Sequence, residues 1–117
     1  MEVQAIYSNA RMSAQKVREV VRQIQGLPAQ QAVAVLKVVP RKSARFVAKT
    51  LDSAIANAED LKRNNSNYSG LDVGALWVKL AAAGTATSWK RMTPKARGSS
   101  GPIIKRNCNI KIVLSDE

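Results

Sequence analysis

Residues 77–115, WVKLAAAGTATSWKRMTPKARGSSGPIIKRNCNIKIVLS, decide the fold of this 117-residue chain. Apolar and polar residues alternate at both ends of the segment, and this period of two predicts β-strands at 77–81 and 108–114. The twenty-six residues between these strands are too many for a tight turn, since loops beyond about 12–15 residues are uncommon in compact domains. The simplest geometry is a long hairpin, with its bend near the glycine and serine cluster within 94–102.

The intervening segment, about residues 85–106, carries charge of one sign. No acid occurs between Val73 and Ser115, whereas basic residues recur throughout this stretch. The only large apolar side chains of the arm are Trp89, Met92, Ile103 and Ile104. Because a two-stranded ribbon is only marginally stable in water, we expect this arm to become ordered against a partner.

The residues before this segment predict three helices, in which apolar residues recur at helical spacing. Their limits are marked by Ser13 as an N-cap, Gly26 as a helix stop and Pro28 in a first turn. The predicted elements are a short strand at 3–8, helices at 13–25, at 28–39 and from 41 to about 62, and a loop at 64–70. The second helix is expected to bury Ala32, Val35, Leu36 and Val39.

These elements predict an α+β fold, with three helices packed on a small antiparallel sheet of about three strands and a long protruding β-hairpin. The chain length predicts one domain, since domains usually hold on the order of 100–200 residues. Its globular body would comprise residues 1–84 and 107–117, and the hairpin arm about 85–106. Much of the apolar content is Ala and Val, so the core is expected to be only marginally stable alone.

The net charge points to a polyanionic partner. Nineteen Lys and Arg face eight Asp and Glu, which gives a formal net charge of +11, and nucleic acid and an anionic membrane surface are the two candidates. No run of eighteen apolar residues occurs, and the basic residues lie on separate elements, so a membrane role is disfavoured. The N-terminus has no signal-peptide pattern, and we expect the protein to work in the compartment where it is made.

Missing residue types disfavour an enzyme. The chain has no His, and Cys108 is its only Cys, so Ser–His and Cys–His nucleophile pairs are excluded and a zinc site is not expected. We therefore expect no catalytic residue, no metal, no cofactor and no small-molecule substrate. Cys108 alternates in phase with Ile110 and Ile112, which predicts a buried, unreactive thiol.

Three basic groups form a candidate nucleic-acid interface. They are Arg11, Lys16, Arg18 and Arg22 at the first helix; Arg41, Lys42, Arg45 and Lys49 at the start of the third; and Lys90, Arg91, Lys95, Arg97, Lys105 and Arg106 in the arm, with Trp89 among them. Each group alone is also typical of a solvated surface, and only the combination favours RNA or DNA. Sequence recognition is not implied, because phosphate contacts position a protein without reading bases.

The second group opposes the helix macrodipole. Cations in the first turn of a helix are disfavoured by about 0.3–1 kcal/mol each. A phosphate bound at the helix start would reverse the sign of this effect, because free N–H groups and basic side chains would converge on it. Trp89 in the arm leaves two alternatives open, which are stacking on an unpaired base and packing across the hairpin.

Five stretches resemble, in this order, bacterial ribosomal protein twenty-two, a universal family of the large subunit: ARMSAQKVREVVRQIQG (10–26), DSAIANAED (52–60), LDVGALWVK (71–79), WKRMTPKARG (89–98) and IKR (104–106). The resemblance implies an α+β body at the subunit surface near the peptide exit, and a hairpin that passes through ribosomal RNA. It also implies that the tip lines the nascent-peptide tunnel with Met92, Pro94, Lys95, Ala96, Arg97 and Gly98.

The same resemblance implies a role in early subunit assembly. The partners would be large-subunit ribosomal RNA, neighbouring ribosomal proteins and, transiently, the nascent polypeptide. The location would be the cytoplasm, in a bacterial ribosome, with an organelle-encoded protein as the alternative. The sequence departs from the family pattern in several places. Ser99 replaces a frequent basic residue, and Pro102 with the Ser99-Ser100 pair makes the return of the hairpin atypical. Asn107-Cys108-Asn109 replaces a frequent Thr-Ser-His, an acidic turn near Gly84 is missing, and the stretch at 64–70 is longer than usual. The residues alone leave a second function open, a free-standing RNA- or DNA-binding module such as a nucleic-acid chaperone.

Overall fold

Strand β5 (Cys108–Ser115) forms the middle of the main sheet. In the computed structural model, which describes residues 1–117, β5 pairs antiparallel with both β1 (Glu2–Ala10) and β2 (Trp77–Thr85), giving the strand order β1-β5-β2. Every second residue of β5 from Cys108 to Leu114 is fully buried, as the alternation in the sequence predicts. The predicted three-stranded antiparallel sheet is confirmed.

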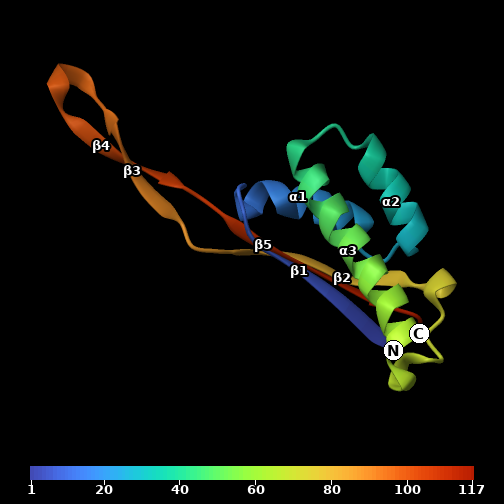
Figure 1. Cartoon of the computed structure of the whole chain (residues 1–117). Helices are drawn as coiled ribbons and strands as arrows, with labels where there is room; N and C mark the ends of the chain where they lie inside the picture. Colours follow the sequence, from blue (N-terminus) through green and yellow to red (C-terminus); the bar gives the residue numbers. More distant parts are fainter.

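Three helices cover one face of this sheet (Figure 1). They are α1 (Ala14–Ile24), α2 (Ala29–Val38) and α3 (Lys42–Asn64), each within two residues of its predicted limits. Gly26 ends the first helix with φ 85°, whereas Pro28 is the N-cap of α2 and not part of its first turn. Val35 and Val39 are half-buried instead of buried, because α2 packs chiefly on α3 and only marginally on the sheet.

The core is built largely from small side chains. Ala44, Ala54 and Ala58 of α3 are at most 2% exposed, so this helix lies close against the sheet. Cys108 is completely buried beneath the helices, and burial raises the pKa of its thiol. The prediction that Cys108 behaves as a small buried hydrophobe is thus confirmed.

Both edge strands are longer than their sequence patterns predict. β1 reaches Ala10 through a bulge at which Asn9 adopts φ 57°, and the Asn9 N–H donates a 3.0 Å hydrogen bond to Asn109 Oδ1. Asn tolerates this left-handed conformation better than most residues. β2 continues to Thr85 instead of ending at Ala81, because its alanine-rich second half stays paired with β5. The predicted loop at 64–70 contains one 3₁₀ turn, Ser66–Tyr68, and a second turn follows at Val73–Ala75.

The arm is a separate two-stranded sheet. β3 (Trp89–Pro94) and β4 (Ser100–Lys105) pair antiparallel, and a short turn at Ala96–Gly98 lies within the predicted bend. Figure 1 shows the arm projecting far beyond the helices, opposite the end where the two termini lie. The radius of gyration is 17.6 Å, against about 13 Å for a compact chain of this length. The predicted protruding hairpin is therefore confirmed.

None of the three helices combines the length and the apolar character needed to cross a bilayer.

Candidate nucleic-acid interface

Charge is segregated along the long axis of the molecule. At the end away from the arm, Asp116 accepts hydrogen bonds from the Met1 amino group (2.9 Å) and from the Asp72 N–H (3.4 Å), and Glu2 and Asp60 line one shared hollow. At the other end, Glu19 is the only acid on the arm, on α1 and on the first turns of α3. The arm end is therefore almost purely cationic.

Six cations line a groove between the body and the base of the arm, which we call the neck groove. Its lining cations are Arg11, Lys16 and Lys42 on the body and Arg91, Lys105 and Arg106 on the arm. The groove has a volume of about 760 Å³, and no acid lines it. A smaller hollow continues from it along α1 and α3 and includes Glu19. Members of all three predicted basic groups thus meet at the neck, although only Lys42 comes from the second group. The sequence does not show this proximity.

Trp89 lies in the neck groove beside two guanidinium groups. The Cζ atoms of Arg11 and Arg91 each lie 5.7 Å from the centroid of its ring, within the cation–π distance of about 6 Å. Trp89 therefore contacts the body through Arg11 and the arm through Arg91. The residue as a whole still keeps 40% of its surface exposed.

Arg18 and Arg22 lie one turn apart on α1 but have different surroundings. Arg18 Nε donates a 3.0 Å hydrogen bond to the carbonyl oxygen of Ala83, which fastens α1 to β2. Arg22 is exposed in the last turn of the helix. The sequence gives no sign of the Arg18 contact, because the two partners are 65 residues apart in the chain.

The start of α3 carries exposed cations and no acid. The N-cap residue Arg41 provides no side-chain acceptor for the helix N–H groups, and the first turn contains no Asp or Glu. Arg41 pairs instead with Glu19 of α1, and the Lys49 ammonium lies 5.7 Å from the ring centroid of Tyr7. The predicted stripe Arg41, Arg45 and Lys49 is exposed as expected, but two of its members also have partners within the chain.

The tip of the arm is closed by hydrogen bonds among its own residues. Lys95 N–H donates to Ser99 O (2.6 Å), and both the N–H and the Oγ–H of Ser99 donate to Ala96 O (3.3 and 2.8 Å). Arg97 and Gly98 take left-handed conformations with φ 59° and 72°. The six predicted tip residues are all exposed: Met92, Pro94, Lys95, Ala96, Arg97 and Gly98. The Ser99 side chain, at a position where the family often has a basic residue, thus adds one hydrogen bond to the two that its backbone makes in the bend.

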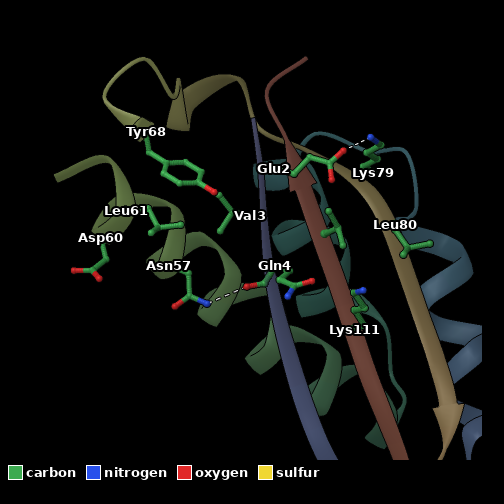
Figure 2. A pocket seen from close by; sticks show the side chains of 11 residues that line it. Glu2, Val3, Gln4, Asn57, Asp60, Leu61, Tyr68, Lys79, Leu80 and Lys111 are labelled. Carbon is green, nitrogen blue, oxygen red and sulfur yellow. Dashed lines mark hydrogen bonds and ion pairs between the residues drawn. The ribbon is translucent and has the colours of Figure 1, made fainter. Parts of the chain in front are cut away.

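A different kind of surface lies at the opposite end of the body, where a hollow lies against the sheet and the end of α3 (Figure 2). Asn57 Nδ2 donates a 3.1 Å hydrogen bond to Gln4 O, and Glu2 pairs with Lys79. The Lys79 ammonium lowers the pKa of Glu2 below its ordinary value. No group of three or more His, Cys, Asp or Glu side chains is placed to hold a metal ion. Paired charges of both signs give this hollow no preference for a polyanion.

A family model described as Ribosomal protein L22p/L17e matches residues 5–115. The chain belongs to this ribosomal protein family. The large ribosomal subunit protein uL22 of Opitutus terrae is 50% identical to the chain over 116 residues, covering 99% of the chain and 96% of that protein. The proteins of the same name from Methylacidiphilum infernorum and Akkermansia muciniphila are 46% and 42% identical over 117 residues, covering the whole chain and 96% and 98% of each relative.

Membership of the L22p/L17e family confirms the resemblance noted in the sequence. It also bears out the expected class, a structural and non-enzymatic protein of the large ribosomal subunit. For an L22p/L17e protein, the cationic arm end is the natural candidate for contact with RNA.

Four residues that line the neck groove of this L22p/L17e protein were not among the predicted site residues: Met12, Ser13, Ile104 and Asn107. Asn107 lines the neck groove although it is only 4% exposed, and its Nδ2 donates a 2.9 Å hydrogen bond to Thr87 O. The pattern of charged residues could not identify Asn107, because its amide side chain is neutral. The one available signal is that Asn107 departs from the family pattern at this position.

Proposed function

We propose that this protein binds large-subunit ribosomal RNA with its arm end, and that the tip of the arm lines the nascent-peptide tunnel. Residues 1–84 and 107–117 would act as a body at the subunit surface, and about 85–106 as an arm threaded through RNA. The observation that carries the proposal is the acid-free, fully projecting arm joined to a neck lined by six cations.

Electrostatics and packing support the same partner. Lys90, Lys95, Arg97 and Lys105 are exposed along a ribbon that has no hydrophobic core, and Met92 and Ile104 of the same ribbon are 66% and 47% exposed. RNA supplies both the phosphates that neutralise these cations and the surfaces that cover these apolar side chains. Binding and ordering of the arm would then occur together, which fits a role in early subunit assembly.

The tunnel assignment is what the family resemblance implies, and the shape of the tip supports it. The bend is only two strands wide, and its exposed residues include cations and the apolar Met92, side chains suited to transient contact with a nascent polypeptide. Val38 of α2, which is 81% exposed beside Val35, Val39 and Pro40, offers an apolar surface for a neighbouring ribosomal protein. The working location would be the bacterial cytoplasm, within the ribosome.

Residue-level RNA crosslinking on intact large subunits tests the proposal. Crosslinks should map to the arm and the neck groove, not to the hollow around Glu2 and Lys79. In a competition for incorporation, the double variant Lys90→Glu with Lys105→Glu should enter subunits poorly. The control Lys62→Glu with Arg63→Glu makes the same charge change in the last turn of α3 and should enter like the wild type. Equal incorporation of both variants would overturn the arm assignment.

A further inference from the structure

We infer that the neck groove holds one unstacked nucleotide of RNA, with its base on the ring of Trp89 and its phosphate among the surrounding cations. This inference rests on the proposed RNA binding and adds to it that the bound RNA is unpaired at one position. Three features of the groove carry the inference: its charge and size, its stacking surface and one buried amide.

Charge and size favour a single strand. The cations that line the groove come from both of its sides, Lys16 and Lys42 from the body and Lys105 and Arg106 from the arm. A phosphodiester that enters between the walls would contact ammonium and guanidinium groups from two directions, whereas a duplex presents its phosphates on a convex surface. The volume of about 760 Å³ lies in the range of about 300–1,000 Å³ in which sites for small molecules occur.

The stacking surface consists of Trp89 and its two guanidinium neighbours. Unpaired RNA bases stack on aromatic rings and on Arg guanidinium planes. The groove offers both, since Arg11 and Arg91 lie 5.7 Å from the Trp89 ring centroid and Trp89 as a residue is 40% exposed. Such a cationic groove with an aromatic platform is the combination by which proteins hold single-stranded nucleic acid.

The buried amide of Asn107 supplies a hydrogen-bond acceptor at the groove wall. Its Nδ2 donates a 2.9 Å hydrogen bond to Thr87 O, which fixes the orientation of the side chain. Its Oδ1 accepts no hydrogen bond within the protein and is not completely buried, and Asn107 is one of the residues that line the groove. An amino or imino group on the edge of a stacked base would satisfy this oxygen, which no phosphate contact can do, because both groups are acceptors.

The test uses two hairpin RNAs that are identical except for one bulged adenosine in the stem. The full-length protein is prepared with Trp77→Phe, so that Trp89 is the only tryptophan. Trp77 lies at the other end of the body, where its Nε1 donates to Glu117 O, and is not part of the groove. The bulged RNA should quench Trp89 fluorescence and bind about tenfold more tightly than the paired RNA, at the lower end of what one base–aromatic stack provides.

Variants separate the nucleotide site from general RNA binding. Trp89→Ala should bind the two RNAs equally, Trp89→Phe should restore the preference, and Lys42→Gln should weaken binding of both. Equal binding of the two RNAs by the parent protein, or a preference that survives Trp89→Ala, would overturn the nucleotide site while leaving the proposed function intact. Binding of neither RNA at low salt would overturn both.

Discussion

Arg18 shows that a positive charge on an outer helix face can also have a structural role. Its Nε–H is held by the Ala83 carbonyl oxygen, which connects α1 to β2. We expect Arg18→Ala to lower the free energy of unfolding by about 1 kcal/mol, because it leaves that carbonyl without its donor. Arg22→Ala, one turn away and exposed, should change it by less than about 0.5 kcal/mol.

Urea unfolding at neutral pH measures both variants. Equal stabilities for Arg18→Ala and Arg22→Ala would show that the contact with Ala83 contributes nothing to stability.

At the scale of elements, the close approach of α3 to the sheet depends on alanine. Ala54 is completely buried, whereas Ala56, on the same helix, is exposed. We expect Ala54→Leu to lower the free energy of unfolding by about 1–3 kcal/mol, since the added atoms have no space in a packed core. Ala56→Leu adds the same atoms on the solvent side and should be nearly neutral. Urea unfolding of the two variants makes the comparison, and similar losses in both would contradict the packing described for α3.

The two edge strands are also connected by an ion pair, between Glu2 of β1 and Lys79 of β2. Their hydrogen bond lowers the pKa of Glu2 below 4.5 and raises the pKa of Lys79 above 10.5. Because the folded-state pKa of the carboxyl group is depressed, its contribution to stability is present above about pH 4.5 and is lost as pH falls through the folded-state value.

We therefore expect the wild type to exceed Glu2→Gln in free energy of unfolding at about pH 6, and the two to converge towards about pH 3. Urea unfolding across this range measures the difference. The effect should be small, since both side chains are about half exposed and solvent screens the pair. A difference that stays constant with pH would show that the ion pair is not its source.

The sequence predicted the elements well where local signals are strong. β5 alternates cleanly, Gly26 and Pro40 end helices, and the polar span 94–102 marks the bend. The bulge at Asn9 and the extension of β2 to Thr85 were missed, because both depend on pairing with β5 and not on local propensity. The same holds for the candidate site. Its cations could be predicted from the sequence, but the neck groove and the place of Asn107 in it depend on long-range contacts.

At the scale of the whole molecule, the arm and the body should differ in stability. The body has a core of 25 buried residues, while the arm is joined to it mainly at the neck. We expect residues 85–106 of the free protein to be cut by proteases well before the body, and to be protected in assembled large subunits. Limited proteolysis followed by mass spectrometry compares the two states.

Protease resistance of the arm in the free protein equal to that of the body would contradict coupled ordering. The Trp89→Ala variant is informative here, because it removes the contacts of the ring with Arg11 and Arg91. It should hasten cleavage of the free arm without changing cleavage of the body.

The strand order β1-β5-β2 has a consequence for biosynthesis. β1 and β2 do not pair with each other. Each can pair only with β5, which is translated after both. Until β5 emerges from the ribosome, the three helices lack the central strand of the sheet on which they pack. The basic arm precedes β5 in the chain and is therefore synthesised before it. Acquisition of the native body should consequently be a single late event, not a stepwise one, and a chain stalled before Cys108 should remain a client for chaperones.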